Sequence, residues 1–288
     1  MEEKEYTGWK HWTPSAEEYV QFYQNGEYGG PCPLELFENE YLIIHDGKQN
    51  DIITGIYRKK QGKIVQVNRA PIKINDPKDG RLKKIYNPRN PEQVCAFDML
   101  HDDDITVKLI TGRWGTGKSV LLVTAALEAL REKRYEKIVW IRNNVEVKDT
   151  PPLGILPGEV VDKLLPYLGP FIDHVGDEQK VEKMIRDGQL EVEPLQSLRG
   201  RNIENAIIMC SEAENLSKEH IQLIIARAAE GSAIWMDGDT RQRDKAAFEK
   251  SKGLETMVKK LANDSLFGYV KLIKTERSAT AALADKLD

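Results

Sequence analysis

A glycine-rich octapeptide near the middle of the chain has the residue types and spacing of a phosphate-binding loop. Two glycines bracket four residues and are followed by Lys118 and Ser119, which is the P-loop pattern. Glycines let backbone N–H groups curl around phosphate oxygens, Lys118 would neutralise the β and γ oxygens, and Ser119 would ligate Mg²⁺. The residues predicted to bind ATP are Gly112, Arg113, Trp114, Gly115, Thr116, Gly117, Lys118 and Ser119.

The segments on either side of this loop predict the structural context that such a site needs. An apolar run at 107–111 precedes the loop, and a helix-forming run begins at Ser119. A loop between a strand and a helix places its backbone N–H groups, and the positive end of the helix dipole, against the anion. Lys118 and Ser119 would then lie in the first turn of the helix.

Residues 87–288 alternate between short apolar runs and helix-length segments. This alternation predicts an α/β domain with a mostly parallel sheet covered on both faces, as in a RecA-like P-loop NTPase core. The predicted strands are 107–111, 138–142, 190–192, 206–210, 233–237 and 268–272. The predicted helices are 118–132, 160–168, 218–229 and 253–261.

Three further segments carry residues suited to nucleotide chemistry. The apolar run 207–210 is followed by Ser211, Glu212 and Glu214, where a Walker B motif belongs. The segment 237–244 contains a Gly-Asp-x-x-Gln core that looks like motif III of superfamily 1 helicases. Upstream, residues 90–93 read Asn-Pro-Glu-Gln and look like the adenine-reading glutamine motif of the same helicases.

With these motifs in place, the chain resembles the PhoH family, the phosphate-starvation-type ATPases with a RecA-like fold. The resemblance covers residues 87–288 and includes the segments 153–158, 166–170 and 199–201. Residues 34–86 are similar to the region that precedes this domain in PIN–PhoH fusions, but no pattern of spaced acidic residues indicates a PIN nuclease. The resemblance implies an ATPase acting on RNA, and the compact form suits a bacteriophage-encoded member.

The resemblance also implies a role for several residues by position. Gln93 would read the adenine edge, Glu212 would activate the attacking water, and Gln242 would sense the γ-phosphate. Asp239 would line the nucleotide site. RecA-like relatives form rings, so a homo-oligomer such as a hexamer is implied. The candidates for a charge-stabilising arginine, which could act across a subunit interface, are Arg199, Arg201 and Arg277.

One position departs from the family pattern. The Walker B strand of the family ends in Asp-Glu, whereas this chain has Ser211 followed by Glu212. The missing aspartate normally supports Mg²⁺ and its waters. Ser211 could contact Mg²⁺ only through water, and Glu212, Glu214 or Asp239 could compensate. We therefore expect slow hydrolysis and weak Mg²⁺ affinity.

Residues 1–86 are predicted to form a separate, β-rich N-terminal region. The runs 52–57 and 64–67 flank a polar turn and predict a β-hairpin. Residues 58–89 hold 11 basic and 2 acidic side chains, net +9, which is either a footprint for a polyanion or an exposed hairpin kept soluble by lysines. An aromatic cluster before it is expected to pack a core rather than stack bases. The nucleic-acid candidates are Arg58, Lys59, Lys60, Lys63, Arg199 and Arg201.

Composition and cysteine usage predict a cytoplasmic protein. No apolar run approaches the length of a membrane span, and the acidic N-terminus is unlike a secretory signal. Three cysteines far apart in the chain fit free thiols in a reducing compartment. The acidic triplet 102–104 is expected to be a solvated turn, not a metal site.

Three functions are compatible with these features. The first is a nucleic-acid-stimulated ATPase, with RNA favoured, since the motifs are helicase-like and the block 58–89 is basic. The second is an assembly module that uses ATP to set its oligomeric state and hydrolyses little, which the altered Walker B segment favours. A small-molecule kinase is the third, and the absence of an arginine-rich lid argues against it.

Overall fold

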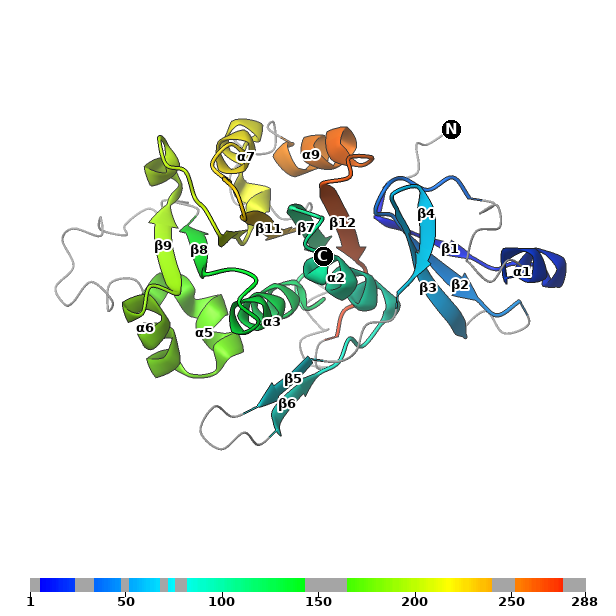
Figure 1. Cartoon of the computed structure of the whole chain (residues 1–288), viewed down its shortest axis with the longest axis horizontal. Helices are drawn as coiled ribbons and strands as arrows, with labels where there is room; N and C mark the ends of the chain where they lie inside the picture. The colour runs from blue at the N-terminus through cyan, green and yellow to red at the C-terminus, as the bar shows by residue number, and fades with distance from the viewer. Residues whose placement is uncertain are drawn as a thin grey trace, which may run out of the picture. The chain divides into compact units, whose positions relative to one another are not determined.

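In the computed structural model, the residues that can be described are 6–23, 34–47, 52–67, 72–75, 82–142, 165–239 and 252–276. The chain divides into two compact units. The first unit comprises Met1–Thr116 and Met257–Asp288, and the second comprises Gly117–Thr256. Figure 1 labels the helices and strands of both.

The first unit begins with a small sheet whose strands follow the order β1-β2-β3-β4. β1 and β2 are parallel, and the other neighbours are antiparallel. Gln61 and Gly62 connect β3 to β4 with φ angles of 51° and 75°, as the two positive φ values of a type I′ hairpin turn require. The predicted hairpin is thereby confirmed. The strands are β1 (Trp9–Trp12), β2 (Tyr41–His45), β3 (Ile53–Lys60) and β4 (Lys63–Gln66).

Aromatic side chains form the core of this small sheet. Trp12 and Tyr57, from two of its strands, pack around Phe22 of helix α1 (Ala16–Tyr23). Tyr23 packs against the same cluster and its hydroxyl lies 2.8 Å from that of Tyr57. These aromatic residues therefore serve packing, as the sequence predicts.

The rest of the first unit supplies the strand that leads into the glycine-rich loop. β7 (Val107–Gly112) and β12 (Phe267–Leu272) pair in parallel, and α2 (Pro91–His101) packs against both. Asn90 caps α2 by accepting a hydrogen bond from the N–H of Gln93. The antiparallel pair β5 (Ile72–Asn75) and β6 (Leu82–Tyr86) precedes α2 in the chain.

The second unit contains four parallel strands in the order β11-β10-β8-β9. Every residue of β10 and β11 is buried, which explains why these strands are continuous apolar runs in the sequence. The strands are β8 (Lys137–Arg142), β9 (Leu190–Pro194), β10 (Ala206–Cys210) and β11 (Ala233–Gly238).

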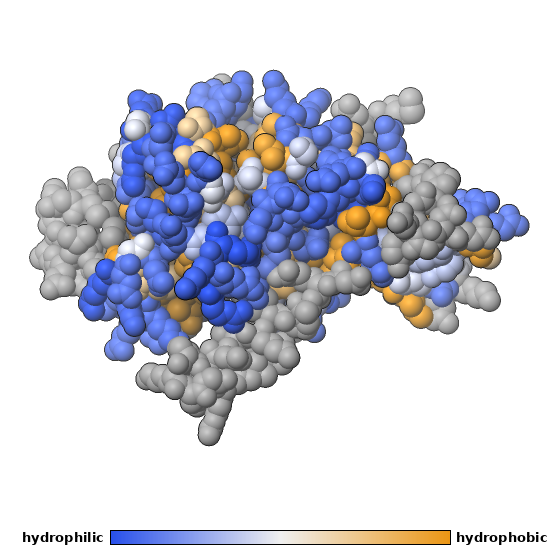
Figure 2. Space-filling view, viewed as in Figure 1, coloured by the Kyte–Doolittle hydropathy of each residue, from blue (hydrophilic) through white to orange (hydrophobic). Residues whose placement is uncertain are grey.

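Helices cover these strands, and α3 is the one that carries the phosphate-loop residues. α3 (Lys118–Arg131) packs against β11 and α5 (Gly169–Val175), and α6 (Glu178–Arg186) packs against α5 and β9. The short turn η4 (Ala213–Asn215) and helix α7 (Lys218–Ile225) follow β10, and α9 (Gly253–Leu261) follows β11. Figure 2 shows that the outer surface over α6 is hydrophilic, as expected for a helix with one buried face.

The predicted α/β fold with parallel strands and a small N-terminal sheet is confirmed. The predicted helix 218–229 is shorter, because the backbone after Ile225 leaves the helix and Ala228 forms a parallel bridge with Ile203. Of the predicted helix 160–168, the described part is the 3-10 turn η2 (Leu165–Leu168). Across the described part of the chain, the longest and most apolar helices fall short of what a bilayer crossing needs.

Candidate nucleotide site

The first half of the glycine-rich loop belongs to the first unit and is tightly folded. A Cβ at Gly112 would lie 2.6 Å from the carbonyl oxygen of Leu272 and 2.9 Å from Oγ1 of Thr116. Gly115 has a φ of 74°, in the left-handed region that favours glycine. The Thr116 hydroxyl is buried and donates to the carbonyl of Arg113 at 2.8 Å. Glycine is thus required where the loop leaves the strand and where it turns.

Gln93, the predicted adenine reader, links helix α2 to this loop. Its side-chain amide donates to the carbonyl of Thr116 at 2.9 Å and accepts from the N–H of Arg89 at 2.9 Å. Glu276 adds a second connection, since its N–H donates to the carbonyl of Gly115 at 2.9 Å and its carboxylate accepts from Asn90 at 2.9 Å. Gln93 therefore holds the loop, and its contact with adenine stays a prediction.

The second half of the loop opens helix α3 in the second unit. Gly117 is the N-cap residue, with φ 93° and ψ 15°, and no side chain caps the helix. The N–H groups of the first helical turn are consequently not used by a capping side chain, which is the arrangement that binds anions at helix N-termini. Lys118 and Ser119 occupy this first turn, as the sequence predicts.

Asp237, at the carboxyl end of β11, is the partner of the loop serine. The Ser119 hydroxyl donates to Oδ2 of Asp237 at 2.9 Å. Asp237 is 2% exposed, and its other oxygen, Oδ1, has no partner within hydrogen-bond geometry. Burial raises the pKa of Asp237, while the hydroxyl of Ser211, the charge of Lys118 and the hydroxyl of Ser119 oppose this rise. Those three contacts favour the carboxylate form.

The residues after β10 supply further carboxylates within the second unit. Glu212 is exposed and has φ 55° and ψ 42°, a left-handed conformation that costs an L-residue energy. The carboxylate of Glu214 accepts from the N–H of Asp239 at 3.0 Å. Burial raises the pKa of Glu214 to about 7. Gly238 makes room for this contact, because a Cβ there would meet the Glu214 carboxylate at 2.9 Å.

These oxygen atoms suit Mg²⁺ when it arrives with a nucleotide. Mg²⁺ prefers hard oxygen ligands, keeps several waters, and is usually held by one or two protein groups together with substrate phosphates. Within the described residues, no group of three or more His, Cys, Asp or Glu side chains forms a metal site of its own. The hydroxyl of Ser119 and the unpartnered oxygen of buried Asp237 match the smaller contribution that a Mg²⁺–nucleotide needs from protein.

Sequence comparison assigns the family. Residues 85–283 match the family model described as PhoH-like protein. The chain belongs to the PhoH-like protein family. Protein PhoH2 of Thermobispora bispora is 33% identical over 202 residues, covering 69% of this chain and 46% of that protein. Protein PhoH2 of Bacillus subtilis is 34% identical over 210 residues, covering 69% and 47%.

The predicted resemblance to PhoH proteins is therefore confirmed, and membership supports a nucleotide-binding P-loop ATPase. The chain spans about half the length of the curated relatives it matches. Among solved structures, the large terminase from a thermophilic bacteriophage aligns with a TM-score of 0.42 and 10% identity, covering 69% of this chain and 50% of that chain.

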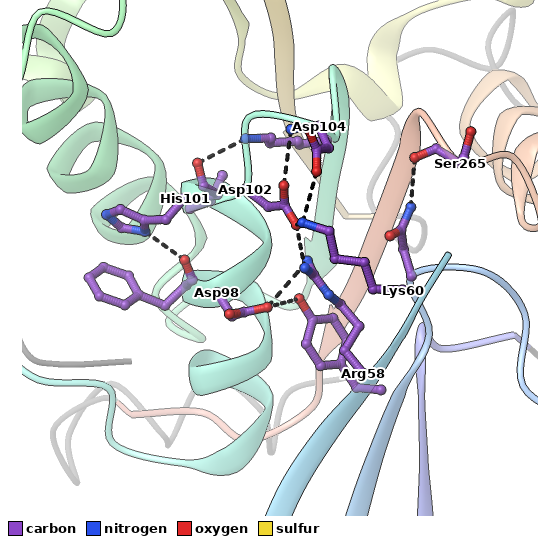
Figure 3. A network of polar contacts seen from close by, with 12 residues as sticks. Arg58, Lys60, Asp98, His101, Asp102, Asp104 and Ser265 are labelled. Carbon is purple, nitrogen blue, oxygen red and sulfur yellow. Dashed lines mark hydrogen bonds and ion pairs between the residues drawn. The ribbon is translucent and has the colours of Figure 1, made fainter. Parts of the chain in front are cut away.

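The basic residues proposed for nucleic acid lie in different environments. Arg58 is 5% exposed and pairs with Asp98 and Asp102, and Lys60 pairs with Asp102 at 2.7 Å and Asp104 at 2.9 Å, as Figure 3 shows. The predicted solvated turn 102–104 is thus tied into this network through two of its carboxylates. Both basic side chains are engaged in holding β3 to α2.

The remaining basic candidates differ in exposure. The Lys59 ammonium donates to the carbonyl of Leu36 at 2.8 Å, whereas Lys63 is exposed. Arg201 pairs with Glu191 and Glu193 on the neighbouring strand β9, and Arg199 is exposed. A role for these residues in binding nucleic acid stays a prediction, with Lys63 and Arg199 the most accessible.

Sequence reasoning missed Asp237, the carboxylate nearest the loop serine. Only the strand register shows its place: Cys210 is the partner of Met236 in the parallel pair of β10 and β11, so Ser211 and Asp237 come next at the same level. The predicted site residues Gln242 and Arg277, and the segment 153–158, lie outside the described residues.

Proposed function

We propose that this PhoH-like chain binds ATP together with Mg²⁺ and hydrolyses it, and that single-stranded nucleic acid, with RNA favoured, stimulates the hydrolysis. The observation that carries the proposal is the start of α3. There an uncapped helix N-terminus presents Lys118 and Ser119, and a buried carboxylate receives the serine hydroxyl. Such a site offers N–H donors and a cation to a triphosphate and oxygen ligands to its metal.

Each residue contributes a defined part of the reaction. The loop N–H groups and Lys118 bind and orient the β and γ phosphates. Asp237 holds the Ser119 hydroxyl in place, and Glu212 accepts a proton from the attacking water. When bound, Mg²⁺ neutralises charge that develops on the phosphate oxygens. Since Glu212 is exposed at a strand end in a strained conformation, its side chain lies outside the packed core and within reach of water.

Coupling to nucleic acid is supported by the exposed basic residues and by the helicase-like motifs in the sequence. Lys63 on the hairpin and Arg199 after the 3-10 turn η3 (Leu195–Leu198) are exposed, so both can contact phosphates. Because the resemblance to RecA-like proteins implies a ring, we propose that the chain acts as a homo-oligomer, with a hexameric ring as the expected form.

Steady-state ATP hydrolysis, with Mg²⁺ and with or without single-stranded RNA, tests this function. We expect turnover that rises with RNA and is abolished in Lys118→Ala. Lys183→Ala, which removes an exposed lysine of α6, is the matched control and should keep full turnover. Equal turnover in Lys118→Ala and the native chain would rule out this site as the source of the activity.

A second candidate function is a nucleotide-dependent assembly module. The neutral Ser211, where a carboxylate is expected, favours it, because weak metal support slows hydrolysis more than it weakens nucleotide binding. In that case ATP would change the sedimentation coefficient of the chain, and RNA would leave its turnover unchanged.

A further inference from the structure

The ends of two neighbouring strands present an unusual pair of side chains. β10 and β11 are parallel, and their register pairs Cys210 with Met236. The next residues, Ser211 and Asp237, therefore emerge at the same level from adjacent strands, which lie about 4.8 Å apart. The Ser211 hydroxyl lies close enough to Asp237 to oppose the rise in its pKa that burial causes. A hydroxyl and a carboxylate thus share one edge of the sheet.

The carboxylate of this pair is the one directed at the phosphate loop. Oδ2 of Asp237 accepts the hydroxyl of Ser119 at 2.9 Å, and Oδ1 is buried without a hydrogen-bond partner. A buried carboxylate oxygen that lacks a protein partner costs free energy unless water or an ion completes it. The ligand expected beside a P-loop serine is Mg²⁺ with its waters.

We propose that Asp237 supplies the carboxylate that supports Mg²⁺ in this chain, and that Ser211 is its hydroxyl neighbour. In the family pattern this carboxylate follows the strand that corresponds to β10, whereas here it lies at the end of the neighbouring strand β11. This inference rests on the proposed nucleotide-binding function and names the residue that gives that site its metal affinity. If Asp237 supplies the carboxylate, Ser211 at the family's aspartate position no longer predicts weak Mg²⁺ affinity.

The other nearby carboxylates are engaged differently. Glu214 accepts the N–H of Asp239 and packs over Gly238. Glu212 is exposed and follows the strand in a left-handed conformation. Asp237, in contrast, accepts the hydrogen bond that the hydroxyl of Ser119 donates. Asp237 is therefore the carboxylate placed to share a metal with this serine.

Binding of Mn²⁺ to the ADP complex tests this assignment without relying on activity. Mn²⁺ uses the same hard oxygen ligands as Mg²⁺, and its free concentration can be followed by electron paramagnetic resonance. Asp237→Asn should weaken Mn²⁺ binding about 10–100-fold. Its affinity for a fluorescent ADP in EDTA should stay unchanged, and its melting temperature without ligand should be no lower. The matched control, Asp173→Asn on α5, removes an exposed carboxylate and should leave Mn²⁺ binding intact.

An exchange of the two residues provides the sharper variant. Asp237→Ser should lose Mn²⁺ affinity, and the double variant Ser211→Asp with Asp237→Ser should recover most of it, because the carboxylate returns to the level of the same register pair. Ser211→Asp alone places a second carboxylate beside the buried Asp237 and should lower the melting temperature. Recovery in the double variant would show that the metal requires a carboxylate at this edge of the sheet.

The outcomes separate this inference from the function on which it rests. Native Mn²⁺ affinity in both Asp237→Asn and Asp237→Ser would overturn the assignment, while nucleotide binding by the native chain would leave the proposed function intact. If the native chain bound no ADP or ATP in the fluorescence titration, the proposed function would fail, and the metal assignment with it.

Discussion

Two regions of the molecule bring carboxylates and cations together, and they do so in opposite ways. In the first unit, Arg58 and Lys60 face three aspartates, and each of those aspartates has a cation within 3.3 Å. At the strand ends of the second unit, four carboxylates lie near one another, and the charge of Lys118 favours ionisation of one of them, Asp237. The carboxylates are Glu212, Glu214, Asp237 and Asp239.

The difference separates charges that stabilise the fold from charges held for a ligand. A buried ion pair is tolerated when its geometry is good and its charges are paired. The carboxylate of Asp102 is bonded by Arg58, Lys60 and the N–H of Asp104, and Nη1 of Arg58 lies 3.3 Å from Asp98, although its Nε makes no hydrogen bond. Asp237, by contrast, keeps an oxygen without a partner, and Glu212 keeps a strained backbone. Neither feature stabilises the fold, so both agree with the proposed nucleotide site.

The largest expected effect is on catalysis. Without it, the carboxylates of the second unit would no longer differ in role from those of the first. Glu212→Gln removes the proton acceptor and keeps the shape, so turnover should fall about 10²–10⁴-fold with little change in the affinity for ATP. Single-turnover hydrolysis beside a nucleotide titration measures both. Glu230→Gln changes an exposed glutamate after α7 and should keep native turnover. A Glu212→Gln variant with native turnover would assign the strained conformation to structure alone.

The next effect is on stability in the first unit. Arg58→Met leaves Asp98 and Asp102 without their shared guanidinium, and the free energy of unfolding should fall by about 3–5 kcal/mol. Lys60→Met, at a side chain that is 30% exposed, should cost less than about 1 kcal/mol. Urea denaturation followed by circular dichroism measures both. An equal decrease in the free energy of unfolding in the two variants would mean that burial does not determine how much each ion pair stabilises the fold.

The sequence predicted the elements of the fold better than it predicted the pairing of charges. The strand at 206–210 and the helix at 253–261 have the bounds that were predicted, because apolar runs and helix signals are local. The place of the glycine-rich loop between a strand and a helix was also predicted, since its glycines and lysine lie within one short segment of the chain. Positions that depend on neighbouring residues within a short segment are accessible to sequence reasoning.

The roles of Asp237 and Arg58 depend on residues far away in the sequence and were not predicted. Asp237 lies 118 positions from Ser119, and only strand order and register bring them together. Arg58 belongs to a basic block that suggests nucleic-acid binding, but it forms an ion pair with Asp102, which lies 44 positions later in the sequence. Composition reports how many charges a segment holds, whereas tertiary contacts decide which of them face a ligand.

A pH dependence sharpens the contrast at a single carboxylate. Burial opposes ionisation of Asp102, but the hydrogen bond from Lys60 and the charge of Arg58 outweigh it and hold its pKa below the ordinary value. A depressed pKa stabilises the fold above the unfolded-state pKa, which is about 4 for an aspartate, and the stabilisation is lost as the pH falls through the folded-state pKa. Asp102→Asn should therefore cost about 1–3 kcal/mol at neutral pH and progressively less in acid.

Denaturant midpoints measured from neutral pH downward, for the native chain and Asp102→Asn, test this dependence. The two midpoints should converge as the pH falls below about 4. Asp173→Asn, at an exposed aspartate, should follow the native chain at every pH. A constant difference between the native chain and Asp102→Asn would show that the variant loses packing and not charge.

The smallest effect concerns the backbone of Glu212. Its left-handed conformation costs an L-residue about 1–2 kcal/mol, and glycine removes this cost. Glycine also makes the unfolded chain more flexible, which lowers the free energy of unfolding by about 0.4–1 kcal/mol. Glu212→Gly should therefore stabilise the fold by up to about 1.5 kcal/mol. Glu230→Gly, at a residue without a positive φ, should destabilise it. Denaturation curves for both variants measure the difference.

The same Glu212→Gly variant should hydrolyse ATP no faster than Glu212→Gln. A protein that becomes more stable and loses turnover through one substitution shows that the strain is retained because the glutamate is needed at that place. Loss of stability in Glu212→Gly would instead mean that contacts of the Glu212 side chain stabilise the fold by more than its left-handed backbone costs. Glu212 would then resemble Arg58, whose charge stabilises the fold.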